Sequence, residues 1–361
     1  MTRPLRAVIH PAALAHNLNV ARKFAPQSKV MAVVKADAYG HGLAGAVQGL
    51  QAADGFGLLT TDQAIHLREM GVDKPLCLLE GFFEPYELTV LAGYGVAVTL
   101  HSEAQLRVLE TTRFKGPLDV WVKLDTGMHR IGFSPGAVAD VMQRLLVLDN
   151  VRPIGFMSHL ANADQVDDPA TEKQLKQFVS TCSAYTKPKS LANSAAVVAW
   201  PATYLDWVRP GIMLYGSSPV AAQSAQELGL QPAMDLDSAL ISIKDLSRGD
   251  RVGYGGTWVC PHDMRIGVVA AGYGDGYPRH APQGTPILVK GRVAPLVGRV
   301  SMDMITLDLS QHDDVQVGDP VRLWGQDLDI DAIAKRVGTI AYELMCGVTA
   351  RVPRVYNDHG G

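Results

Sequence analysis

Cysteine is scarce in this sequence of 361 residues, which contains only four. No two of them form a CxxC pair, and their spacing is not that of a zinc site. So few cysteines in a chain of this length are typical of proteins from a reducing compartment. We therefore expect buried thiols at Cys77, Cys182, Cys260 and Cys346, and we expect no metal site.

Charge of one sign and long apolar runs are also missing. The net charge is -3, and the 33 basic residues are scattered, so no large basic surface is available for nucleic acid. No run is long enough to span a bilayer, and the N-terminal residues lack a secretory apolar region. These absences favour a cytoplasmic protein that acts on a small molecule and uses neither nucleic acid nor a membrane.

The apolar content of 47% and the length predict two packed domains. Over the first two thirds of the chain, short apolar runs alternate with segments of helical spacing. Eight such alternating units favour an α/β fold, a (β/α)8 TIM-type barrel. The eight runs are 29–35, 54–59, 75–80, 95–100, 118–125, 152–159, 189–193 and 207–214, and a helical stretch, 11–24, precedes them.

Beyond about residue 230 the pattern changes to β-branched runs separated by Gly, Pro and Asp turns, as in 265–271, 286–289 and 292–297. This pattern predicts a C-terminal, mainly-β domain whose one clear helix is 329–337. We therefore expect a barrel domain over residues 1–230 and a β-rich domain over residues 231–361.

A barrel requires its functional residues at the C-terminal ends of the strands, and the loops after the seventh and eighth strands commonly bind phosphate. Polar residues occur at these positions: Lys35 on the first run, Lys123 and Asp125 on the fifth, His159 on the sixth, Asn193 and Ser194 on the seventh, and Arg209 on the eighth. Gly211 and Ile212 supply the expected phosphate loop of the eighth unit.

Lys35 closes an apolar run and precedes a glycine-containing turn, Ala36-Asp37-Ala38-Tyr39-Gly40-His41-Gly42. Burial of a lysine ammonium is costly, and desolvation lowers the amine pKa, so this position suits a Schiff-base lysine. A strand-end lysine whose ammonium simply reaches water is the alternative.

The stretch Ala32 to Gly42, AVVKADAYGHG, resembles the cofactor-lysine signature of the bacterial alanine racemases, and the likeness continues over nearly the whole chain. That family uses pyridoxal 5'-phosphate (PLP) to interconvert L- and D-alanine. The resemblance implies that Lys35 holds the cofactor as an aldimine and that Tyr39 contacts its phosphate. The phosphate loops at Asn193, Ser194, Gly211 and Ile212 would join Tyr39 there, which makes these residues cofactor ligands.

Arg209, in Val208-Arg209-Pro210-Gly211, would face the pyridine nitrogen of the cofactor according to the resemblance. An arginine cannot accept the proton of that nitrogen and disfavours its protonation by like charge, so the electron sink is weakened. Racemisation tolerates this, whereas the related barrel decarboxylases place an acidic residue there. A salt-bridged barrel arginine is the alternative. Ser190 departs from the histidine that supports this arginine in some members, which leaves the support of Arg209 open.

Inversion at the α-carbon needs a proton-transfer group on each face of the intermediate. The resemblance assigns Lys35 to one face and Tyr254 to the other. A free tyrosine has a pKa of ~10, so His159 and Arg209 are the expected relay that lowers it. By spacing alone, Tyr254 is equally an ordinary turn tyrosine beside glycines.

Recognition of the substrate carboxylate is assigned by the resemblance to Arg130 and to the backbone of Met302, with Tyr273 also in the substrate site. Many members carry a carbamylated lysine that orients the arginine, and Lys123 holds that position. A plain Lys123 hydrogen-bonded to Asp125 is the alternative, and simple packing is the alternative for Met302.

The family forms a head-to-tail homodimer, in which Tyr254 and Met302 enter the partner's active site. Tyr342 would contact the cofactor and narrow the access corridor together with Tyr254, which favours alanine, with serine as a slow substrate. Arg279 is a further second-domain residue near this corridor. The role in the cell, D-alanine supply for the cell wall or alanine breakdown, stays open.

Four other interpretations remain: a broader racemase of small amino acids, a barrel-fold PLP decarboxylase, a non-catalytic cofactor carrier, and an unrelated barrel enzyme with a structural lysine. Arg209 argues against the decarboxylase. The carrier proteins lack a second domain, so Tyr254 would have no counterpart there.

Overall fold

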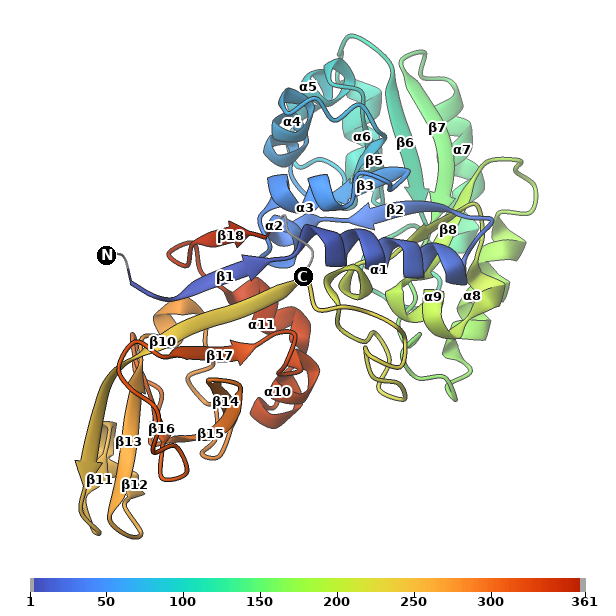
Figure 1. Cartoon of the computed structure of the whole chain (residues 1–361). Coiled ribbons are helices and arrows are strands. Elements are labelled where there is room, and N and C mark those ends of the chain that lie inside the picture. The colour runs from blue at the N-terminus through green and yellow to red at the C-terminus, as the bar shows by residue number, and fades with distance from the viewer. Residues whose placement is uncertain (1–2, 358–361) are drawn as a thin grey trace.

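The computed structural model describes residues 3–357 and shows a barrel joined to a β-rich domain (Figure 1). Eight parallel strands form a closed barrel, which β2 and β9 close by pairing Lys29 with Trp207 and Val30 with Val208. Their bounds confirm the eight expected strands. They are β2 (Lys29–Val33), β3 (Gly55–Leu58), β4 (Leu76–Leu78), β5 (Val96–Leu100), β6 (Leu118–Lys123), β7 (Val151–Met157), β8 (Lys189–Asn193) and β9 (Trp207–Arg209).

Helices cover the outside of the barrel. The hydroxyls of Thr60 and Ser102 accept hydrogen bonds from the backbone N–H groups of Gln63 and Gln105, in the first turns of α4 and α6, which places the starts of these helices. One face of α7 is apolar and buried against the strands, as the helical spacing predicts. The outer helices are α1 (Pro11–Phe24), α3 (Leu43–Gly49), α4 (Thr61–Glu69), α5 (Glu87–Gly93), α6 (Glu103–Thr111), α7 (Val138–Leu146), α8 (Ala170–Thr181) and α9 (Ser194–Ala199).

Side chains fill the interior of the barrel. One buried cluster consists of Met31, Cys77, Ala97, Trp121, Met157 and Trp207, in which the two tryptophan rings meet edge to face at 6.4 Å. A barrel packed in this way has no pore. A ligand site is therefore confined to the loops at the ends of the strands.

The C-terminal domain is built on an eight-stranded sheet with the order β13-β16-β15-β14-β17-β10-β1-β18. A short hairpin of β11 and β12 lies at the end of this domain that is remote from the barrel (Figure 1). The expected mainly-β character is confirmed. The strands are β10 (Met234–Leu246), β11 (Arg251–Val252), β12 (Trp258–Val259), β13 (Met264–Val269), β14 (Pro286–Val289), β15 (Arg292–Val297), β16 (Ile305–Asp308), β17 (Pro320–Trp324) and β18 (Arg354–Tyr356).

Strand β1 (Arg6–Ile9) belongs to this same sheet, because it pairs antiparallel with β10 and parallel with β18. The second sheet thus takes a strand from the range 1–230 that the sequence assigns to the barrel. The division at residue 230 stays a prediction, and the outermost residues of the two expected domains, 1–2 and 358–361, lie outside the described residues.

Two helices lie in the C-terminal domain. Helix α10 (Ile330–Val337) confirms the expected helix, and α11 (Ala341–Gly347), which the sequence did not predict, contacts the turn after β2. Three of the cysteines are buried as expected, but Cys346 on α11 is exposed, so that expectation is wrong for this residue. None of the helices described between residues 3 and 357 is long and apolar enough to cross a membrane.

Candidate active site

Lys35 begins an unusual backbone turn, α2 (Lys35–Tyr39), directly after β2. The four residues after the lysine have φ between 52° and 54°, the left-handed region. Each such L-residue costs about 1–2 kcal/mol relative to a right-handed helix. Backbone hydrogen bonds from Ala38 to Val34, at 3.0 Å, and from Gly40 to Ala36, at 2.9 Å, hold the turn. The strain places Lys35 and Tyr39 at the mouth of the barrel.

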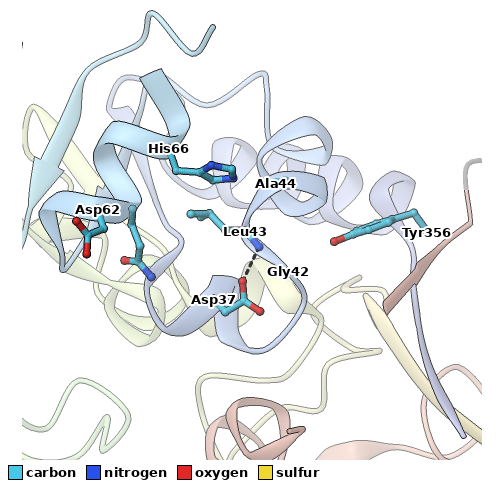
Figure 2. A pocket seen from close by; sticks show the side chains of 8 residues that line it. Asp37, Gly42, Leu43, Ala44, Asp62, His66 and Tyr356 are labelled. Atoms are coloured by element: carbon cyan, nitrogen blue, oxygen red, sulfur yellow. Dashed lines mark hydrogen bonds between the residues drawn. The ribbon is translucent and has the colours of Figure 1, made fainter. Parts of the chain in front are cut away.

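The carboxylate of Asp37 anchors the far side of this turn by accepting from the N–H of Leu43 at 2.8 Å, where α3 begins. A surface hollow adjoins it (Figure 2). Its lining residues are Asp37, Gly42, Leu43, Ala44, Asp62, Gln63, His66 and Tyr356, of which none was predicted as a site residue. The hollow therefore lies beside the predicted site and does not contain it.

Tyr39 forms one wall of a polar cradle. Its ring stacks on Tyr215 at 4.6 Å, and its hydroxyl lies so close to Gly211 that a Cβ there would approach it to 2.4 Å. The N–H of Gly211 donates to the Ser194 hydroxyl at 2.7 Å. The N–H of Ile212 finds no acceptor among the residues described. Free backbone donors beside hydroxyls suit a phosphate group.

Two further predicted cofactor residues border this cradle. The ring of Tyr342, on α11, lies 6.0 Å from that of Tyr39, so the second domain reaches the mouth of its own barrel. Burial raises the pKa of both phenols, which keeps the hydroxyls neutral and able to donate. The Asn193 side chain accepts from the Ala196 N–H at 3.0 Å and caps α9. Asn193 thus supports the Ser194 loop.

Arg209 is buried at the end of β9 and is held by neutral oxygens. It donates to the Ser190 hydroxyl and the Ser158 carbonyl at 2.5 Å each, and to the Leu191 carbonyl at 3.3 Å. Burial lowers its pKa to about 10, so it keeps its charge near neutrality. No carboxylate pairs with it within residues 3–357, which rules out the salt-bridged alternative.

The sequence left open what supports Arg209, because Ser190 stands where some family members have a histidine. In the structure, the Ser190 hydroxyl itself supports Arg209 by accepting its hydrogen bond. Its hydroxyl donates to the carbonyl of Trp207 at 3.0 Å, which leaves an oxygen lone pair facing the guanidinium. The sequence did not single out Ser158, whose carbonyl also holds Arg209. Its place between the end of β7 and His159 is the signal that could have revealed it.

Lys123, Arg130 and His159 line a small cavity at the ends of β6 and β7. Burial, followed by the charges of Arg209 and Arg130, lowers the pKa of Lys123 to about 8. Burial and the charge of Arg209 also lower the pKa of His159 well below its ordinary value. At neutral pH the imidazole is therefore uncharged, and the lysine loses its proton far more readily than a surface lysine does.

Asp125 does not neutralise Lys123. Its Oδ1 accepts from the N–H groups of Gly127 and His129 at 3.0 Å each, and its other oxygen lies 3.3 Å from the His129 ring. No hydrogen bond joins it to Lys123 in the described part of the chain. The carboxylate shapes the loop that carries Arg130.

The predicted residues of the second domain, apart from Tyr342, are not gathered at the barrel. Tyr254 adjoins the remote β11–β12 hairpin, and 69% of its surface is exposed (Figure 1). Met302 and Tyr273 are also exposed on this domain, and so is Arg279. A single chain therefore does not bring Tyr254 to Lys35.

Known protein families match both domains of this chain. Residues 9–219 match the family described as alanine racemase, N-terminal domain, and residues 233–356 match alanine racemase, C-terminal domain. The chain belongs to the alanine racemase family. The resemblance and the barrel-plus-β fold class are thereby confirmed.

Individual relatives within the family are similar over their whole length. The alanine racemase of Nitrosospira multiformis is 49% identical, with 98% of this chain and 100% of that protein covered. The alanine racemase of Paraburkholderia phytofirmans is 50% identical, with 98% and 99% covered. The crystal structure of the biosynthetic alanine racemase from Pseudomonas aeruginosa superposes with a TM-score of 0.95 at 46% identity, covering 99% of this chain and all of that one.

Proposed function

We propose that this member of the alanine racemase family interconverts L- and D-alanine with PLP. The main supporting observation is the arrangement at the barrel mouth. Lys35 lies there with a polar cradle that suits a phosphate group and with Arg209, which pairs with no carboxylate among the described residues. Its relatives from Nitrosospira multiformis and Paraburkholderia phytofirmans are named alanine racemases, which supports the same activity. The family relationship makes the protein an isomerase.

The residues present fit this cofactor. The hydroxyls of Tyr39 and Ser194 and the free N–H of Ile212 would hold its phosphate, with Gly211 leaving room for close approach and Tyr342 above. Lys35 would bind its aldehyde carbon. When bound, PLP supplies an electron-withdrawing ring that makes the α-proton of an amino acid removable.

Arg209 sets how strong that withdrawal is. Its guanidinium is fixed by Ser190 and Ser158 and cannot take up a proton, so it would disfavour by like charge the protonation of a pyridine nitrogen bound beside it. A weaker sink suits exchange of one proton and disfavours decarboxylation and transamination. This observation ranks the racemase above the decarboxylase.

Lys35 and Tyr254 are the two proposed bases, and a second copy of the chain must supply the tyrosine. One observation supports a head-to-tail homodimer: Tyr254 is exposed on a hairpin that lies remote from its own barrel (Figure 1). His159 and Arg209 lie beside each other on the barrel side, where they would lower the pKa of the incoming tyrosine.

The substrate carboxylate would contact Arg130 and the main chain of Met302, with Tyr273 beside them. Burial lowers the pKa of Lys123 to about 8, so a larger fraction of this amine is neutral than in a surface lysine, as attack on carbon dioxide requires, and the carbamate formed would give Arg130 an anionic partner. Tyr342 and Tyr254 together would limit the site to small side chains, so alanine is preferred. A broader racemase of small amino acids is the runner-up.

We also assign the protein to the cytoplasm, since its cysteines, Cys346 included, are free thiols in the described chain.

The test is racemisation by the purified, PLP-loaded protein. L-alanine and D-alanine should each be converted to the racemic mixture, with serine slower and bulky amino acids unreactive. Release of carbon dioxide as the main reaction would identify a decarboxylase instead. Equal rates with larger amino acids would favour the broader racemase.

A further inference from the structure

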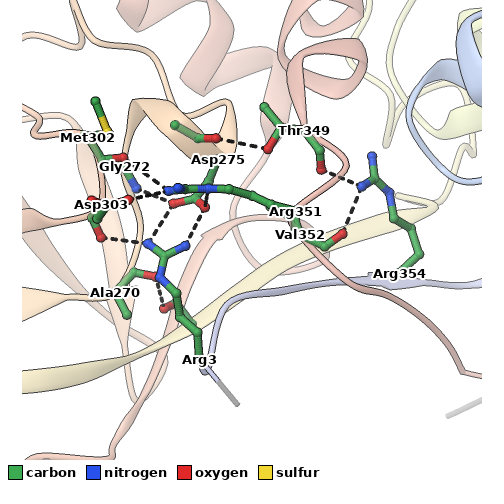
Figure 3. Close-up of polar contacts among 12 residues, drawn as sticks. Arg3, Ala270, Gly272, Asp275, Met302, Asp303, Thr349, Arg351, Val352 and Arg354 are labelled. Atoms are coloured by element: carbon green, nitrogen blue, oxygen red, sulfur yellow. Dashed lines mark hydrogen bonds and ion pairs between the residues drawn. The ribbon is translucent and has the colours of Figure 1, made fainter.

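Asp275 has a side chain with no solvent exposure, yet it lies between two arginines from opposite ends of the chain (Figure 3). Arg3 donates to both carboxylate oxygens, with 2.8 Å to Oδ2, and Arg351 donates through Nε to Oδ1 at 2.7 Å. Burial raises the pKa of Asp275, but the hydrogen bonds from Arg3 and Arg351 outweigh it, and the pKa lies below its ordinary value. The carboxylate is therefore ionised and doubly paired.

The same two arginines reach the segment that contains Met302. Arg351 donates to the Asp303 carboxylate at 2.6 Å and to the Met302 carbonyl at 3.4 Å. Arg3 donates to the Asp303 carbonyl at 2.7 Å. Two arginines and two aspartates balance in charge, so this network itself offers a carboxylate ligand no unpaired cation.

The turn η5 (Tyr273–Asp275) is fastened to this segment by its backbone. The N–H groups of Tyr273 and Gly274 donate to the carbonyls of Ser301 and Met302 at 3.0 and 2.9 Å. A Cβ on Gly272 would lie 2.3 Å from the Met302 oxygen, so only glycine permits this approach. The Met302 carbonyl is thus occupied, whereas its N–H has no acceptor among residues 3–357 and the residue is 53% exposed.

We propose that Asp275 is a positioning residue for substrate binding: through Arg3, Arg351 and turn η5 it fixes the free N–H of Met302 for a substrate carboxylate. The inference rests on the proposed function, in which Met302 of one chain serves the site of its partner. It adds the residues that determine where the donor stands. It also gives the N-terminal segment a part in substrate binding, because Arg3 precedes β1, a strand of the C-terminal sheet.

The experiment compares Asp275→Asn with a matched control, Asp237→Asn. Asp237 pairs with Arg322 at 2.9 Å between β10 and β17, so its loss removes a similar ion pair from the same domain. In Asp275→Asn, the KM for alanine should rise about tenfold or more with kcat changed by less than about threefold, as for one lost hydrogen bond to a charged group. Amide exchange over residues 298–304 should be about tenfold faster. The control should change neither quantity.

A second variant, Arg351→Lys, keeps the charge but loses the fork that joins Asp275 to Asp303, so it should show the same effects more weakly. It decides the matter if Asp275→Asn does not fold. Unchanged exchange over 298–304 in a folded variant, or a fall in kcat as large as the rise in KM, would overturn the proposal. The exchange measurement needs neither substrate nor cofactor. If the wild-type protein fails to racemise alanine, the proposed function falls, and the exchange data still decide the role of Asp275.

Discussion

Lys35 and Tyr254, the two residues proposed to move the substrate proton, have opposite surroundings. Lys35 stands among buried groups of its own barrel, next to the cradle of Tyr39, Ser194 and Gly211. Tyr254 adjoins a two-stranded hairpin, with 69% of its surface exposed. Under the proposed function, the chain would therefore hold a cofactor site that its own packing completes, and a second base that has no site of its own. Enzymes with this division depend on association for catalysis but not for cofactor binding.

Lys35→Ala is the substitution with the largest expected effect on activity. Removing the lysine deletes both the attachment point of the cofactor and one proton-transfer group, so alanine racemisation should fall by about 10⁴-fold or more. Borohydride reduction of the PLP-loaded wild type, followed by peptide mapping, should label Lys35. A label on another lysine would show that the barrel mouth was assigned wrongly. Lys29→Ala, at the opposite end of β2, is the control that should retain both label and activity.

Tyr254→Phe tests the other side of the comparison. The ring remains but the ionisable hydroxyl is lost, so racemisation should drop by ~100-fold or more. Deuterium exchange at the α-carbon should survive for one enantiomer only, the one whose proton Lys35 handles. Equal loss for both enantiomers would argue against two one-sided bases.

Mixing the two inactive variants sharpens the result. A hybrid dimer of one Lys35→Ala chain and one Tyr254→Phe chain contains one site with both native residues, so activity should return to a fraction of the wild-type rate. No recovery in verified hybrids would mean that each chain completes its own site. Titration of PLP into a monomeric form should still show binding, because the cradle belongs to one chain.

The two regions also differ in how well the sequence predicts them. Barrel strands are short, mostly buried apolar runs, so the apolar pattern locates them, and strand ends locate Lys35, Lys123 and Arg209. Pairing between distant segments leaves no such local signal. Strand β1 has only four residues, and its place between β10 and β18 depends on partners more than two hundred residues away.

Local sequence propensity does not predict the backbone conformation of the turn after Lys35. Four consecutive non-glycine residues after Lys35 adopt positive φ, and no residue type in Ala36-Asp37-Ala38-Tyr39 predicts that conformation. Helix α11 was missed because its N-cap position, Ile340, has no side-chain cap. The role of Ser190 was missed because the contact with Arg209 exists only once β8 and β9 lie side by side.

Arg209→Glu changes the chemistry of the barrel region without touching the hairpin. A carboxylate there would allow protonation of the pyridine nitrogen, so racemisation should fall about tenfold to 100-fold while transamination rises. Ser190→Ala removes only one of the hydrogen bonds to Arg209 and should cost less than about tenfold. Product analysis for pyruvate separates the two. Normal racemisation by Arg209→Glu without pyruvate would remove Arg209 from the reaction.

The smallest expected effect concerns Lys123, whose amine would react with dissolved carbon dioxide. With a pKa of about 8, the neutral fraction rises steeply between pH 7 and pH 8.5. Protein freed of carbon dioxide should gain activity a few-fold on addition of bicarbonate, more at pH 8.5 than at pH 7, since only the neutral amine reacts. With ¹³C-bicarbonate, a carbamate resonance should appear in wild type and in Lys176→Gln, an exposed-lysine control, but not in Lys123→Gln.

The stability of carbon-dioxide-free protein provides a separate check on the same lysine. The pKa of Lys123 falls from its ordinary 10.5 in the unfolded chain to about 8 in the folded one, so the unfolded state binds more protons between these values. Its contribution to the free energy of unfolding must therefore rise with pH across this window and be lowest below pH 8. Lys123→Met should be more stable than wild type below pH 8, and the difference should shrink toward pH 10.5. A constant difference across the window would mean that Lys123 is not an ionisable buried amine, and the carbamate would lose its physical basis.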